Sequence, residues 1–160
     1  MQLGQRAARV GIIAMVGVAT LGVAVPAFAT AQTGSVAGMT FDLGPSPVGL
    51  PSSCNFPNAD ANFVYLNGNG VFHGTSNKNG DWGGQTAEGT AVFYEDTTQI
   101  AVGHLTIWGG GGNNAKGQTE GGLTLNFTSS VVSIHVNAHQ TTNASGTPTA
   151  NALNVQVTCS

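Results

Sequence analysis

The sequence predicts an all-β protein, with a single antiparallel β-barrel or barrel-like sandwich of about seven or eight strands closed by one disulfide. Short runs rich in β-branched and aromatic residues alternate with turn clusters from Phe63 onward. No segment after the first thirty residues shows helical periodicity over the ten or so residues that a helix requires. Asn-Gly pairs, which are typical of tight hairpins, occur at two of the connections between these runs, so consecutive strands are expected to be antiparallel neighbours.

The first 29 residues have the pattern of a secretory signal peptide. Arg6 and Arg9 form a basic start, an apolar run covers residues 10–25, and Ala27-Phe28-Ala29 forms a small-x-small cleavage site before Thr30. The apolar run is shorter than the roughly 20 residues needed to span a bilayer. We therefore expect a secreted, extracellular protein whose mature chain begins near Thr30 and has no membrane attachment after cleavage.

The charge of the mature chain excludes two classes of partner. Two lysines against seven carboxylates leave residues 30–160 with a formal charge of −5. A protein that binds nucleic acid needs cations to displace the counterions of the phosphates, and an anionic membrane surface makes the same demand. The expected partner is thus an unknown small ligand, a glycan or a protein, and neither nucleic acid nor membrane.

Residues 30–53 are rich in proline and glycine and predict a loosely held leader that contributes one strand near Phe41. The domain follows from Cys54 to Ser160. Its expected strands cover residues 63–66, 71–76, 85–95, 100–108, 123–129, 131–139 and 152–159. Residues 67–70 (Asn-Gly-Asn-Gly) and the pair Asn79-Gly80 are expected to form hairpin turns.

Side-chain alternation in the late strands predicts one buried and one wet face, because successive residues of a strand point to opposite sides. The run 100–108 is apolar on both faces, so its second face needs a cover, for which the leader around Phe41 is the candidate. Cys159 shares its face with the apolar residues of the last strand. As the only cysteines of an exported chain, Cys54 and Cys159 are expected to form a core-side disulfide.

Four consecutive glycines, residues 109–112, follow Trp108 and predict a long hairpin connection. A phosphate-binding loop would need a Gly-Lys-Ser/Thr sequence, whereas Lys116 is followed by Gly117. The dinucleotide pattern fits Gly110, Gly112 and Ala115, but no helix follows to supply the anion site. No cofactor is therefore expected.

Two tryptophans offer a candidate binding surface. Trp82 and Trp108 lie beside stretches rich in Gly and Asn, and an indole framed by amides is a suitable platform for a sugar or peptide. The candidate ligand-binding residues are Trp82, Trp108, Asn113, Asn114 and Asp81. The alternative is that each indole caps the core at the end of a strand.

His73, His104 and His135 recur at spacings of 31 residues and are the candidates for a metal site. His139 lies about 13 Å from His135 along the same strand, too far for both to chelate one ion. The sparse carboxylates, with Glu95 beside Asp96 and Asp81 near Glu88, lack a paired-acid arrangement. No catalytic residue is predicted, which favours a non-enzymatic protein.

Four stretches, CNFP, FHGTSNKNGDWGGQTAEGTAVF, GHLTIWGGGGNN and VNAH, together with the terminal cysteine, resemble small secreted actinobacterial β-proteins of unassigned function. The resemblance covers residues 54–160 and implies no activity. We expect a secreted domain that binds a small ligand, a glycan or a surface partner through loops bearing Trp82 and Trp108. The alternatives are a histidine-based metal protein or metalloenzyme and an extracellular structural or assembly component.

Overall fold

The protein is all-β, as the sequence predicts. The computed structural model describes residues 30–45, 54 and 60–160, so the expected signal peptide lies outside the described residues. Eight strands form one antiparallel sheet: β1 (Thr30–Ser35), β2 (Thr40–Pro45), β3 (Asp60–Asn77), β4 (Gly80–Glu95), β5 (Thr98–Asn114), β6 (Thr119–Thr128), β7 (Val132–Thr142) and β8 (Pro148–Cys159). Their order across the sheet is β1-β3-β4-β5-β6-β7-β8, and β2 pairs with the first part of β3. The sheet is not closed, which excludes the closed-barrel form of the prediction.

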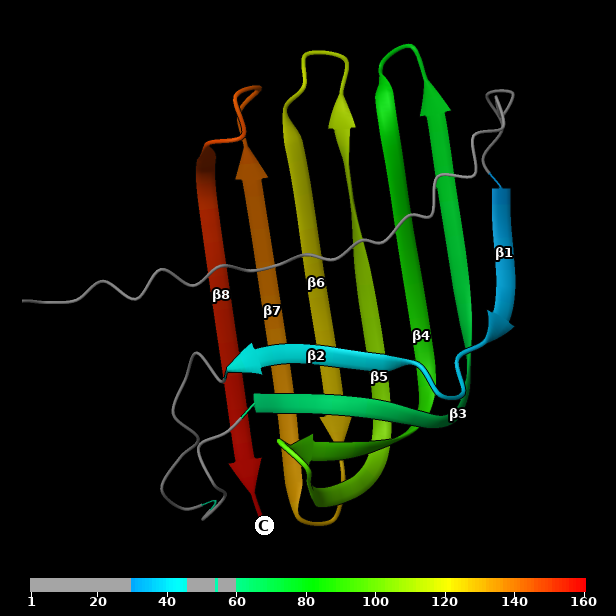
Figure 1. Ribbon diagram of the computed structural model, residues 1–160, viewed down its shortest axis with the longest axis vertical. Coiled ribbons are helices and arrows are strands. Elements are labelled where there is room, and N and C mark those ends of the chain that lie inside the picture. The colour runs from blue at the N-terminus through cyan, green and yellow to red at the C-terminus, as the bar shows by residue number, and fades with distance from the viewer. Residues whose placement is uncertain (1–29, 46–53, 55–59) are drawn as a thin grey trace, which may run out of the picture.

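The sheet folds over on itself instead (Figure 1). β2 and the adjoining ends of β3, β4 and β5 run across the front of its lower half. We call this layer, residues 40–45, 60–66, 90–95 and 98–102, the folded arm. The part that the arm does not reach, residues 71–77, 80–86, 108–114, 119–124, 137–142 and 148–154, we call the open half. The molecule therefore has two layers at one end and continues as a sheet beyond them at the other.

Glycines make the corner at which the arm turns. β3 has a register shift between Tyr65 and Asn67, followed by Gly68 at a φ of 141°. A Cβ at Gly68 would lie 2.2 Å from the carbonyl oxygen of Glu88, and one at Gly89 would lie 2.1 Å from that of Asn67. No other residue fits where the backbones of β3 and β4 approach so closely, which is a typical role of glycine at a sheet corner.

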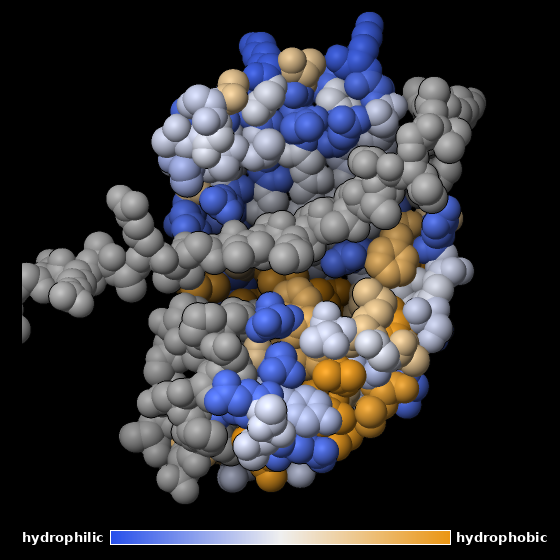
Figure 2. Space-filling model, viewed as in Figure 1, coloured by the Kyte–Doolittle hydropathy of each residue, from blue (hydrophilic) through white to orange (hydrophobic). Residues whose placement is uncertain are grey.

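The hydrophobic core fills the space between the folded arm and the sheet. Phe63 and Phe93 from the arm stack with their ring centroids 5.1 Å apart, and Phe127 of β6 lies 5.3 Å from Phe63. Leu105 and Leu125 are fully buried beside them. In Figure 2, hydrophobic residues gather on the lower half of this face, whereas hydrophilic residues dominate the upper end.

Tyr65 fixes the arm to the sheet beneath it. Its hydroxyl donates to the carbonyl oxygens of Ala87 at 3.2 Å and Leu105 at 3.4 Å. Burial, with a smaller contribution from the charge of Glu88, raises the pKa of Tyr65 to about 12. The phenol thus stays protonated and can act as a donor at any ordinary pH.

The predicted disulfide is present. Cys54 and Cys159 are bonded with their Cα atoms 5.3 Å apart, across a sequence separation of 105 residues. Cys54 is buried and Cys159 packs against the core cluster, so the expected position on the core side is confirmed. The bond ties the end of β8 to the segment before β3.

Two of the expected turns are strand instead. Residues 67–70 lie inside β3, at its corner, and the four glycines 109–112 lie inside β5. The connection between β5 and β6 is only residues 115–118. The hairpin predicted at Asn79-Gly80 is confirmed, although its two-residue turn is Lys78-Asn79, since Asn77 pairs with Gly80 at the start of β4.

The leader also differs from the expectation. It supplies two strands, β1 and β2, rather than one. Phe41 pairs with Phe63 and packs against the core, not on the second face of β5. That second face is uncovered, because Val102 is 46 % exposed and Trp108 is 50 % exposed. Within the residues that the structure describes, no helix has the length and hydropathy required to cross a bilayer.

Candidate functional site

The candidate site begins with a row of small residues across the open half of the sheet. Strand register aligns Gly84 of β4, Gly110 of β5 and Gly122 of β6, with His73 of β3 at one end of the row and His139 of β7 at the other. Directly paired residues of antiparallel strands share a face. We call the face of the sheet that points away from the folded arm the outer face. The glycine row therefore gives the outer face a floor of bare backbone that is three strands wide.

The two tryptophans flank this floor on the same face. Trp108 lies two residues before Gly110 along β5 and pairs with Thr124, whereas Trp82 lies on the opposite side in a row with Gly112 and Glu120. At 3.3 Å per residue, each row lies about 7 Å from the glycine row. The two indoles therefore come from rows about 13 Å apart, with the floor between them.

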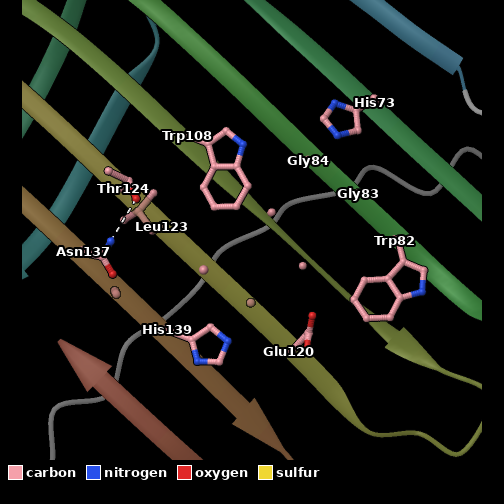
Figure 3. Close-up of a pocket in the computed structure, with 15 residues that line it drawn as sticks. His73, Trp82, Gly83, Gly84, Trp108, Glu120, Leu123, Thr124, Asn137 and His139 are labelled. Atoms are coloured by element: carbon pink, nitrogen blue, oxygen red, sulfur yellow. Dashed lines mark hydrogen bonds between the residues drawn. The ribbon is translucent and has the colours of Figure 1, made fainter.

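Figure 3 shows that Trp82, Trp108, His73, His139 and Glu120 surround a centre of glycines. We call this hollow the Trp trough; its volume is about 340 Å³. It is a shallow depression rather than an enclosed cavity, because its floor is the sheet itself.

Both indoles are open to solvent. Trp82 is 42 % exposed and Trp108 is 50 % exposed, so neither caps the core, and that alternative is wrong. A Cβ placed on Gly122 would lie 3.8 Å from Cζ3 of Trp108 and 3.9 Å from Cδ2 of His139. The rings of Trp108 and His139 thus lie beside the bare backbone of β6, at ordinary contact distance from the position that a Cβ of residue 122 would occupy.

Polar groups occupy the rim. Nδ2 of Asn137 donates to Oγ1 of Thr124 at 3.4 Å beside Trp108 (Figure 3). The ring of His73 lies over Gly84, with Nε2 only 2.7 Å from where a Cβ would be. Glu120, opposite Trp82, is exposed and has no ion-pair or hydrogen-bond partner among the described residues. The trough thus combines two apolar faces with donors and acceptors at its edges.

The other predicted ligand-binding residues do not join the tryptophans. Asp81 and Asn113 pair across β4 and β5 on the opposite face of the sheet, where the Asp81 N–H donates to Oδ1 of Asn113 at 3.1 Å. Asn114 holds the β5–β6 turn, because its Oδ1 accepts from the N–H groups of Lys116 at 2.9 Å and Gln118 at 3.1 Å. All three act at the end of the hairpins rather than in the trough.

The predicted metal candidates share the outer face but do not converge. From the register, His104 lies about 12 Å from His135 and roughly 20 Å from His73. His135 instead approaches Asn126, with Nδ1 2.6 Å from Oδ1. Across residues 30–45, 54 and 60–160, no group of three or more His, Cys, Asp and Glu residues could hold a metal ion.

Asp81 and Glu88, one of the close carboxylate pairs in the sequence, do not face each other. Asp81 and Glu88 lie on opposite faces of β4, since they are an odd number of residues apart along a regular strand. Glu95 is fully buried at the end of β4, and neither of its oxygens has a hydrogen-bond partner among the described residues. Burial, and secondarily the charge of Asp96, raises the pKa of Glu95 above its usual range.

Sequence reasoning missed the floor, His139 and Glu120. The available signal was the hairpin register: once the β5–β6 turn is placed at residues 115–118, Gly110 falls opposite Gly122 and Gly112 opposite Glu120. Fold and site together define an all-β protein with a folded-over sheet and an aromatic trough on its outer face. Comparison with protein-family models, curated proteins and solved structures found no match to this chain.

Proposed function

We propose that this protein is a secreted, non-enzymatic binding domain and that its Trp trough holds a glycan built of neutral or amino sugars. The observation that carries the proposal is the pair of exposed indoles, Trp82 and Trp108, on either side of a floor without side chains. Large aromatic faces exposed next to a hollow are costly to leave in water, and a ligand that covers them gains their apolar area.

A sugar fits this combination of surfaces. A pyranose ring has an apolar face of C–H groups and a rim of hydroxyls, so it can stack on an indole while its rim meets polar side chains. His73, His139, Thr124 and Asn137 place such groups around the floor. The glycines allow the ring to approach the backbone closely, as expected where a strand must admit a ligand.

The charge of the trough narrows the class of glycan. Glu120 is the only Asp, Glu, Lys or Arg among its described lining residues. The mature chain has only Lys78 and Lys116 as cations, and they lie in or beside the β3–β4 and β5–β6 turns. An anionic sugar would thus meet a carboxylate and no lysine or arginine among the lining residues, whereas an amino group could pair with Glu120 and the face of Trp82.

The test is a titration of the purified protein with neutral, amino and uronic oligosaccharides, followed by calorimetry and tryptophan fluorescence. We expect Trp82→Ala and Trp108→Ala to weaken binding by about tenfold or more, as for aromatic anchors. Val102→Ala is the matched control, because Val102 is an exposed apolar residue on the same strand as Trp108 but lies in the folded arm, outside the trough. Glu120→Gln should weaken the binding of amino sugars alone.

Two outcomes would overturn the proposal. One is an unchanged fluorescence and melting temperature across all three sugar classes. The other is binding that Trp82→Ala and Val102→Ala reduce equally, because the ligand would then contact some other part of the outer face.

Secretion is supported by the pattern of residues 1–29 and is compatible with the Cys54–Cys159 disulfide, since such bonds persist in oxidising compartments. Expression of the full chain in an exporting host tests it. We expect the protein in the culture medium with an N-terminus at or near Thr30, and retention of the whole chain inside the cell would contradict it.

A further inference from the structure

The two edges of the sheet are built differently. One consists of two short strands of six residues each, β1 and β2, which both pair with β3, whereas the other is the single twelve-residue strand β8. Within the described residues, β8 pairs with β7 alone, so its second edge has no partner strand. Long free edges readily pair with another chain, and natural sheets usually protect them with charges, prolines, bulges or short length.

β8 has almost none of these protections. Residues 121–160 contain no Asp, Glu, Lys or Arg, although they make up the last forty residues of the chain. The only proline of β8 is Pro148, at its first position, and the only register shift with β7 lies between Thr141 and Thr142, also at that end. From Ala150 to Cys159 the edge is regular and uncharged.

The hydrogen-bond pattern shows which backbone groups are free. The Ser160 N–H donates to the carbonyl of Val131 at 3.0 Å, which makes these two residues a hydrogen-bonded pair. Such pairs alternate along an antiparallel ladder. The even-numbered residues from Thr158 back to Ala150 therefore bond to β7, and the odd-numbered ones direct their N–H and C=O groups outward: Asn151, Leu153, Val155, Val157 and Cys159.

We propose that β8 is a self-association edge and that it pairs antiparallel with β8 of a second copy of this chain. The same strand in both copies is self-complementary, because a two-fold axis normal to the sheet places each outward N–H opposite an outward carbonyl. With no charge on the strand, no repulsion opposes this pairing. The two eight-stranded sheets would become one continuous sheet.

The pairing would also bring two binding sites together. Antiparallel strands related by this axis keep equivalent faces on the same side, so both outer faces would point in one direction. In the direction across the strands, the His139 residues at the β7 ends of the two troughs would be three strand spacings, or about 14 Å, apart. A dimer would thus present two troughs to one polymeric ligand, although the edge pairing itself does not depend on what the troughs bind.

Proline at an outward position tests the edge directly. Asn151→Pro removes one outward N–H and is tolerated where that group does not bond within the sheet. Asn151→Ala is the matched control, because it changes the side chain and keeps the donor. Ala152→Pro tests which N–H groups of β8 point toward β7 and which point outward. It removes a hydrogen bond to β7 and should therefore lower the melting temperature.

The measurements are sedimentation equilibrium of the full chain from micromolar to millimolar concentration and hydrogen exchange of the β8 amides. We expect the mass to double with concentration for the wild type and Asn151→Ala, and to stay monomeric for a folded Asn151→Pro variant. The amides of Leu153 and Val155 should gain protection as the dimer forms. A wild type that is monomeric at all concentrations overturns the proposal, as does protection of these amides at every concentration, which would mean that the chain's own residues cover the edge.

Discussion

Alanine substitution at each of the four consecutive glycines of β5 tests whether they are strand, as the structure shows, or a flexible connection. The structure assigns each position a different environment. A Cβ on Gly109 would first meet Cδ1 of Leu123 at 3.5 Å, an ordinary contact, and one on Gly110 would meet the carbonyl oxygen of Gly83 at 3.1 Å. A Cβ on Gly111 would lie 2.5 Å from the Glu120 oxygen, and one on Gly112 only 2.0 Å from the Asp81 oxygen.

These distances predict a graded series. Gly109→Ala should raise the free energy of unfolding by about 0.4–1 kcal/mol, because alanine restricts the unfolded chain and fits the strand. Gly110→Ala requires a small displacement of β4 and should be close to neutral. Gly111→Ala and Gly112→Ala force neighbouring backbones apart and should destabilise by about 1–3 kcal/mol, with the larger effect at Gly112.

Equilibrium unfolding in urea, followed by far-UV circular dichroism, measures the series, provided that the slopes agree between variants. A flexible loop would give four similar and small effects. A Gly112→Ala variant as stable as Gly109→Ala would contradict the strand assignment, since the difference of 1.5 Å between their nearest contacts would then have no consequence.

The same substitutions separate stability from binding. Gly122→Ala places a methyl on the floor of the trough, at 3.5 Å or more from its neighbours, so it should keep the fold and weaken the ligand. Gly121→Ala is its matched control on the other face of β6, where the nearest atom is 3.7 Å away. Equal loss of affinity in both variants would place the ligand elsewhere.

Three further predictions concern the folded arm and the disulfide. Because the folded-state pKa of Glu95 is raised, ionisation of this buried carboxyl adds no cost at pH values below its usual pKa and destabilises the fold increasingly as pH rises above it; Glu95→Gln should raise the urea midpoint at pH 7 but not at pH 4, and an equal gain at both would contradict this. Tyr65→Phe should cost about 1–3 kcal/mol in urea unfolding, because the carbonyls of Ala87 and Leu105 lose their buried donor. Reduction of Cys54–Cys159 should cost about 4–5 kcal/mol for a loop of this length, and an unchanged midpoint would show that the bond does not constrain the unfolded chain.

The parts of the fold that the sequence predicts are those set by local alternation. The faces of residues 123–128 and 132–139 follow from period-two patterning, and the side of Cys159 follows from the same parity. The bend of β3 is different, because Asn67-Gly68 has the sequence of a hairpin turn and acts as a corner. Nothing local distinguishes the two, since the decisive contact is the approach of Gly68 to Glu88 on another strand.

The sequence also predicts only part of the candidate site, namely its two tryptophans. Trp82 and Trp108 stand out by residue type, and both are in the trough. The sequence predicts Asn113 and Asp81 as partners of the tryptophans because they are close to them in the chain. A strand, however, places adjacent residues on opposite faces. Strand parity places Asn113 on the other face, away from the trough, whereas the β5–β6 register places Glu120 in it. The distance between these residues in the sequence predicts neither result.

Glycine has two distinct roles in this sheet, and the distinction bears on function. At Gly68, Gly89 and Gly112 a side chain would collide with backbone at 2.0–2.2 Å, so the fold itself requires glycine. At Gly122 the nearest atom to a Cβ is 3.5 Å away, and Gly83 and Gly121 on the other face have similar room. Glycine in a strand is less stable than alanine by about 0.5–1 kcal/mol, so folding alone does not account for these positions.

Glycine at these positions of the open half thus makes the fold less stable than alanine would. On the outer face, Gly122 lies in the row between the two exposed indoles. Bare backbone there gives a flat ligand access to both rings, which alanine at Gly122 would restrict by placing a methyl beside Trp108. A surface selected only for folding would have been filled at this position. The exposed tryptophans beside Gly122, a position where folding does not require glycine, therefore support the proposed binding surface.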